Sequence, residues 1–70
     1  MKRKSLKYNE EDMLEVAKAM AIVRETGYVN MLDRRGVVDV LFEIGDDFSA
    51  HYVLNNIGQY TNLLQLSEQF

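Results

Sequence analysis

Three residues with metal-binding side chains recur at four-residue intervals: Glu43, Asp47 and His51. On one continuous helix, positions i, i+4 and i+8 share a face, so two carboxylates and an imidazole would point the same way. Carboxylate and imidazole groups are common ligands of zinc. Gly45 and Asp46 lie between them, however, and these residue types typically end one helix and begin the next. We therefore expect capping and solvated acids here, and no metal site.

The rest of the sequence contains no combination of residues typical of an active site. His51 is the one histidine of the chain, and a single histidine does not supply a catalytic triad with its supporting residues. The three serines, Ser5, Ser49 and Ser67, have no credible general base, and no glycine-rich phosphate-binding loop occurs. We predict a protein without enzymatic activity and without a cofactor.

The chain has 70 residues, which is enough for one domain. A chain this short buries only about 60% of the surface that it exposes when unfolded, so partners or self-association are common sources of extra stability. It has no cysteine, which fits a reducing compartment. No apolar run approaches the roughly 18 residues of a membrane span, and no apolar signal core follows the basic start. We expect a cytoplasmic protein that does not enter a membrane.

The net charge of −3 is unevenly distributed along the chain. Half of the eight basic residues lie in the first seven positions, as Lys2, Arg3, Lys4 and Lys7. The remaining residues contain four basic and eleven acidic side chains. We therefore divide the chain into a basic, frayed tail over residues 1–8 and one acidic domain over residues 9–70.

Helix signals begin directly after the basic tail. Asn9 precedes three acids, and a first helical turn favours negative charge because its backbone N–H groups are free. With Asn9 as the cap, Tyr8 and Met13 have the spacing of a hydrophobic staple. Apolar residues then recur at helical spacing until about Thr26, and Gly27 is placed to end the helix.

The segment 28–42 fits two structures. As a hairpin, its apolar runs would be strands on either side of Asp33-Arg34-Arg35-Gly36, but Arg34-Arg35 is poor chemistry for a tight hairpin turn. As a helix, it would be capped by Asp33, with Leu32 and Val37 as a staple and Gly45 as the terminator. Its apolar face would consist of Val37, Val40, Leu41 and Ile44. The helix is favoured, at a cost of up to about 1 kcal/mol for Gly36.

Two further helices follow. Asp46 and Asp47 can cap a helix that carries Phe48, Tyr52 and Val53, which Asn55 or Asn56 interrupts. Asn56 and Gln59 then have capping-box spacing before a last apolar face of Ile57, Tyr60, Leu63 and Leu64. The sequence thus predicts an all-α domain, a compact bundle of about four short helices. The alternative is an α+β fold with a hairpin at residues 28–42.

Residues 22–33 carry a family resemblance. The run Ile22-Val23-Arg24-Glu25-Thr26-Gly27, followed by Val29-Asn30-Met31-Leu32-Asp33, is similar to the core of a small uncharacterised family from phages and prophages of Firmicutes. Val37, Val40, Gly45 and Tyr60 fit the same pattern, so the resemblance covers about residues 20–64. It implies an all-α domain encoded by mobile-element DNA, with no catalytic residues, in the cytoplasm of a bacterial host.

Protein binding is the function that the charge pattern favours. Asp39, Glu43, Asp46 and Asp47 are close in sequence and could present a negative patch to a basic surface on a host protein that handles nucleic acids. Self-association is a second route. Several Met and aromatic residues exceed what a small core needs, namely Met13, Met20, Tyr28, Met31, Phe42 and Phe70.

Nucleic-acid binding is the alternative function. Two short helices that meet at Gly45 have the outline of a helix-turn-helix. The second helix would begin with Asp46 and Asp47, and two carboxylates repel a polyanion. The contacts would then come from Lys2, Arg3, Lys4 and Lys7 of the tail together with Arg34 and Arg35. We therefore expect a protein partner rather than nucleic acid.

Overall fold

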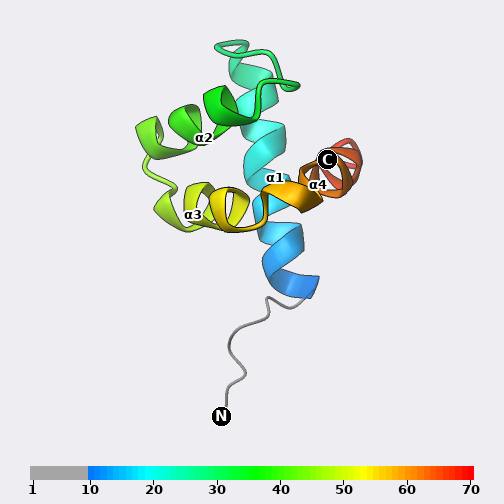
Figure 1. The fold of residues 1–70 in the computed structure, drawn as a ribbon. Coiled ribbons are helices and arrows are strands. Elements are labelled where there is room, and N and C mark those ends of the chain that lie inside the picture. The colour runs from blue at the N-terminus through cyan, green and yellow to red at the C-terminus, as the bar shows by residue number, and fades with distance from the viewer. Residues whose placement is uncertain (1–9) are drawn as a thin grey trace.

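The computed structural model describes residues 10–70 and shows a small bundle of helices (Figure 1). The helices are α1 (Glu10–Thr26), α2 (Arg34–Glu43), α3 (Asp47–Asn55), the short 3-10 helix η1 (Ile57–Gln59) and α4 (Tyr60–Ser67). No strand occurs among these described residues. The prediction of an all-α bundle of four short helices is confirmed, and the hairpin alternative for residues 28–42 is wrong because α2 occupies most of that segment.

The longest helix, α1, forms the support on which the others pack. The helices α2 and α3 fold back on each other and lie on one side of α1, whereas α4 packs chiefly on α1 itself (Figure 1). The loop that joins α1 to α2 and the connection that joins α2 to α3 therefore lie at opposite ends of α2 (Figure 1).

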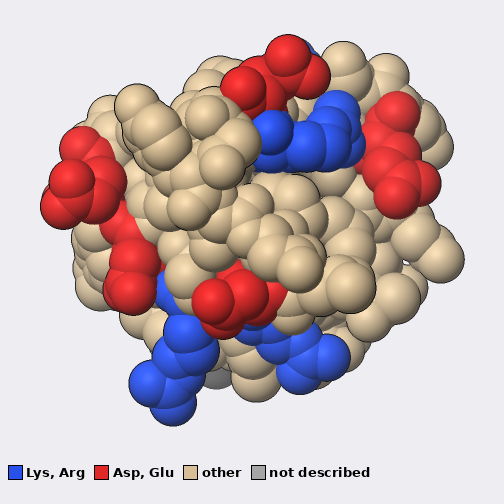
Figure 2. Space-filling model, turned by 90° about the horizontal axis from the view of Figure 1, so that it is seen from above, with Lys and Arg blue, Asp and Glu red and all other residues tan. Residues whose placement is uncertain are grey.

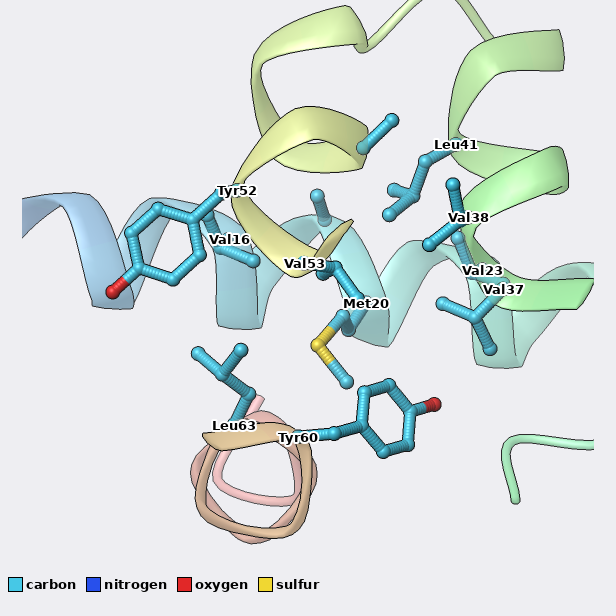
Figure 3. Close-up of a cluster of buried hydrophobic side chains, with 12 residues drawn as sticks. Val16, Met20, Val23, Val37, Val38, Leu41, Tyr52, Val53, Tyr60 and Leu63 are labelled. Carbon is cyan, nitrogen blue, oxygen red and sulfur yellow. The ribbon is translucent and has the colours of Figure 1, made fainter. Parts of the chain in front are cut away.

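The core is built from one face of each α-helix. Met20 of α1 lies between Val53 of α3 and Tyr60 of α4 (Figure 3). The apolar periodicity predicted for the first helix is confirmed in α1, where Val16, Ala17, Met20 and Val23 are fully buried and Met13 packs against the core. The other buried apolar residues are Ala19, Ala21, Val37, Val38, Leu41, Ala50, Tyr52 and Leu63. The predicted cap Asn9 and the staple residue Tyr8 lie outside the described residues.

The N-terminus of α2 depends on Asp33 and Gly36. Asp33 is the N-cap, as predicted, and its Oδ1 accepts a hydrogen bond from the backbone N–H of Gly36 at 3.0 Å. A Cβ at Gly36 would collide with Cγ2 of Val29 and would lie 2.7 Å from Oδ2 of Asp33. Gly36 is therefore required by the close approach of the preceding loop, and is not only a weak point in the helix.

Gly27 and Gly45 end α1 and α2 in the left-handed conformation, with φ of +70° and +85°. Both were predicted to do so. After Gly45, the N–H of Asp46 donates back to the carbonyl of Leu41 at 2.9 Å, which satisfies one of the last carbonyls of α2. The chain reverses within these few residues, and α3 follows directly.

Several predicted side-chain positions are wrong. Leu32 is 77% exposed and does not form a staple with Val37. Ile44 was expected on the apolar face, but it is 43% exposed because α2 ends at Glu43 and leaves it in the connection, whereas Val38, which was not expected there, is buried. Asn56 forms no capping box with Gln59, since its side-chain amide donates instead to the carbonyl of Tyr52 at 2.9 Å.

Candidate partner-binding surface

The connection between α2 and α3 brings apolar and acidic side chains to one part of the surface. We call this surface the α2–α3 corner and define it by Asp39, Phe42, Glu43, Ile44, Asp46, Asp47 and Phe48. It contains all four predicted partner-binding acids. These acids are close in sequence, and they lie where α2 joins α3 because Gly45 turns the chain between the two helices.

The apolar part of the corner consists of Phe42, Ile44 and Phe48, which are 38%, 43% and 48% exposed. The ring of Phe42 meets the ring of His51 edge to face, with centroids 5.2 Å apart. The ring of Phe48 lies 6.3 Å from that of Tyr52. Such ring contacts restrict the aromatic side chains of the corner and leave part of each ring exposed. They are held in place and remain available to a partner.

The four acids of the corner do not all have the same role. Asp39, Glu43 and Asp47 are exposed, whereas Asp46 is half-buried. Asp46 is the N-cap of α3, where its Oδ1 accepts from the N–H of Ser49 at 3.1 Å and its Oδ2 from the Ser49 hydroxyl at 2.9 Å. Three of the four predicted acids are thus free to contact a partner. The fourth, Asp46, caps the N-terminus of α3.

The charges do not merge into one acidic face. Seen from above, carboxylates fall in several separate groups with uncharged surface between them, and Lys and Arg side chains lie close to some of them (Figure 2). Acidic groups stand at the edge where α2 joins α3, which is at the left in both views (Figures 1 and 2). The corner is therefore an apolar surface with acids beside it, and not a broad negative field.

The three residues with metal-ligand spacing do not share one helix. Glu43 is the last residue of α2, Asp47 is the first of α3, and His51 packs against Phe42. Within residues 10–70, no group of three or more His, Asp or Glu side chains is placed to hold a metal ion.

Of the residues predicted for nucleic-acid contact, the structure describes only Arg34 and Arg35. Lys2, Arg3, Lys4 and Lys7 lie outside the described residues. The guanidinium of Arg34 lies over the ring of Tyr60, 5.8 Å from its centroid, and Arg35 is exposed beside it at the start of α2. Arg34 thus already contacts an aromatic ring of the protein's own core.

The Met and aromatic residues proposed for self-association separate into two groups. Met20 is fully buried and Met13 and Met31 pack against the core, so these methionines are explained by packing. Phe42 and Tyr28 are exposed, and Phe70 is half-exposed beneath the ammonium of Lys18, which lies 5.7 Å from the ring centroid.

Sequence reasoning missed several exposed apolar residues. Ile44 was assigned to an apolar helix face and Leu32 to a staple, and Phe48 was placed on the third helix with no statement of its exposure. Their exposure follows from where the helices end, and apolar periodicity does not report that within one or two residues. The signal that could have found Ile44 is its position directly before the terminating Gly45.

A hollow beside α1 is too small to be an obvious ligand site. It has a volume of about 160 Å³, is open to solvent, and is lined by Glu10, Met13, Leu14 and Leu66. Binding sites for small molecules are usually several hundred cubic ångströms and more enclosed. The lining residues include no pair of groups suited to catalysis.

Within residues 10–70, none of the helices combines the length and apolar character needed to span a bilayer. No protein-family model matches the chain, and no curated protein or solved structure matches it either. Its function is therefore inferred from its own residues and their geometry.

Proposed function

We propose that this chain is a non-catalytic protein-binding module that docks the α2–α3 corner on a basic surface of another protein. The observation that supports this most directly is the pairing of exposed aromatic rings with free carboxylates. Phe42 and Phe48 are exposed apolar anchors, and Asp39, Glu43 and Asp47 are exposed on the same two helices.

Protein interfaces commonly use this combination of groups. Buried aromatic anchors supply much of the affinity, and flanking charges supply specificity and speed of association. Ring contacts with His51 and Tyr52 already restrict the two phenylalanines, so less side-chain freedom is lost on binding. The complementary partner presents an apolar recess flanked by Lys or Arg.

The biological setting of the proposal comes from the sequence resemblance. A phage or prophage accessory protein would act in the cytoplasm of its bacterial host, and a basic surface is typical of proteins that handle nucleic acids. Occupation of that surface would exclude the partner's nucleic acid. The proposed role is thus inhibition or redirection of a host protein by occupancy.

The test is affinity capture from a Firmicute lysate, with the variant Asp39→Lys/Glu43→Lys beside the unchanged protein. Both substitutions lie on α2, and a lysine near the C-terminal end of a helix is compatible with the helix dipole. Glu15→Lys/Glu68→Lys is the matched control, because it makes the same change in net charge at exposed positions on α1 and after α4.

We expect a protein that is retained after nuclease treatment by the unchanged chain and by the control, and that is lost with the α2 variant. Equal retention by both charge variants would contradict binding through the corner. Retention that disappears with nuclease would favour the nucleic-acid alternative instead. Circular dichroism of each variant establishes that the helices are intact.

A further inference from the structure

Two side chains in the loop between α1 and α2 are the most exposed large apolar residues of the described chain. Tyr28 is 78% exposed and Leu32 is 77% exposed, whereas the next in rank, Ile22, is 57% exposed. Single exposed apolar residues are ordinary on protein surfaces. Two that are almost fully exposed in one short loop form a surface that a partner can cover.

The exposure of these residues is not caused by a loose loop. The N–H of Leu32 donates to the side-chain oxygen of Asn30 at 2.9 Å, and the N–H of Asp33 donates to the Asn30 carbonyl at 2.8 Å. The N–H of Tyr28 donates to Oγ1 of Thr26 at 3.2 Å. The backbone of the loop is therefore held by local hydrogen bonds, and it carries both apolar side chains outward.

Positive charge follows the loop directly. Arg34 and Arg35 are the first two residues of α2, and both are exposed. Their two positive charges exceed the single negative charge of Asp33, whose carboxylate accepts a hydrogen bond from the Gly36 N–H. We call Tyr28, Leu32, Arg34 and Arg35 the loop tip. It is apolar and basic, whereas the α2–α3 corner at the other end of α2 is apolar and acidic.

The two surfaces cannot meet within one molecule. They are separated by the length of α2, which has ten residues and so spans about 15 Å. Val37, Val38 and Leu41 pack the buried face of α2 against the core, so the helix keeps its length and its two ends stay apart. Contact between the two surfaces therefore requires a second copy of the chain.

We propose that the loop tip of one molecule docks on the α2–α3 corner of a second molecule, so that the chain associates head to tail. The apolar side chains of the two surfaces would cover each other, with Arg35 placed against the carboxylates of the corner. Such contacts are heterologous, and they continue into a chain or close into a ring.

Self-association would also regulate the proposed function, because a corner that is covered by a second copy is closed to another protein. This inference shares the corner with the proposed function but needs no external partner. A partner with higher affinity for the corner would dissociate the assembly as it binds.

The test is sedimentation of the purified chain over a wide range of concentrations. The variant Leu32→Ser/Arg35→Glu changes two of the four residues of the loop tip, and Asp39→Lys/Glu43→Lys reverses the charge at two of the four acids of the corner. All four positions are exposed, so the fold is retained. The control Glu15→Lys/Glu68→Lys changes neither surface.

We expect the unchanged chain and the control to form species larger than a dimer as concentration rises, and each variant alone to remain monomeric. An equimolar mixture of the two variants should form a complex of two chains, because one supplies an intact corner and the other an intact loop tip. Added salt should weaken every association.

A wild-type chain that is monomeric at all concentrations would overturn the inference. So would an assembly that stops at two chains and is not restored by mixing the variants, since that result indicates a symmetric dimer. Partner capture separates this result from failure of the proposed function. Leu32→Ser/Arg35→Glu leaves the corner intact and should still capture the host protein.

Discussion

The hydroxyl of Tyr60 donates a hydrogen bond to the backbone carbonyl of Met31, which lies 29 residues earlier in the chain. Tyr60 is the first residue of α4, and Met31 lies in the loop before α2. The ring itself is buried in the core next to Met20 (Figure 3). One side chain thus fills the core with its ring and fixes the exposed loop with its hydroxyl.

The substitution Tyr60→Phe should destabilise the protein by about 1 kcal/mol, because it removes this hydrogen bond and leaves the half-buried carbonyl of Met31 without its partner. The loss is measured as a change in the free energy of unfolding by urea. Tyr28→Phe is the control. The Tyr28 side chain is exposed, so this substitution should not measurably change the free energy of unfolding. Equal effects of the two substitutions would contradict the structural role of the Tyr60 hydroxyl.

The contribution of Tyr60 should disappear at alkaline pH. Burial raises the pKa of the Tyr60 hydroxyl above 10.0; the Arg34 guanidinium opposes this rise, and the Asp33 carboxylate adds to it. The unfolded chain therefore loses this proton at a lower pH than the folded chain does. The stability linked to Tyr60 is fully present below the unfolded pKa and is lost as pH rises through the folded pKa.

The measurement is urea unfolding of the unchanged protein and of Tyr60→Phe at a series of pH values up to and beyond 10.0. Other tyrosines and lysines titrate in both proteins, so the difference between the two curves isolates Tyr60. We expect the advantage of the unchanged protein to shrink as the pH rises. A difference that stays constant or grows with pH would show that the hydroxyl is not buried.

Gly36→Ala should destabilise the protein, although alanine is normally favoured over glycine in a helix by about 1 kcal/mol. The new methyl group would collide with Val29 and with the capping carboxylate of Asp33. Overpacking of this kind typically costs about 1–3 kcal/mol. Gly58→Ala is the matched control, because nothing lies within 4 Å of a Cβ at that position, and thermal unfolding should show it to be neutral or slightly stabilising.

Four of the helix boundaries could be predicted from the sequence because their signals are local. Asp33 and Asp46 cap the helices that follow them, and Gly27 and Gly45 end the helices before them. Each of these signals acts within four residues of its own position. The prediction of four helices therefore needed no knowledge of how they pack.

Tertiary contacts could not be predicted in the same way. The packing of Val29 against Gly36 and the hydrogen bond from Tyr60 to Met31 depend on how the elements meet in space. The same distinction applies to the residues of the candidate site. Its acids were predicted from their closeness in sequence, but the exposure of Ile44 and Phe48 depends on where α2 ends and α3 begins.

Asp46 and Asp47 differ in role although they are adjacent and carry the same charge. Asp46 caps α3 through both the N–H and the hydroxyl of Ser49, whereas Asp47 is exposed in the first turn. Asp46→Ala should therefore lower the free energy of unfolding by about 1 kcal/mol. Asp47→Ala should lower it by only a few tenths, through the helix dipole.

Substitutions at Asp46 and Asp47 also distinguish an effect on folding from an effect on partner binding. Asp46→Asn removes the charge but keeps a side-chain oxygen that can cap the helix, so its urea unfolding should resemble that of the unchanged protein. If the corner binds a basic surface through its free carboxylates, Asp47→Ala should weaken partner capture more than Asp46→Asn does. The opposite order would show that the capping carboxylate is itself the contact with the partner, because both variants lose one negative charge.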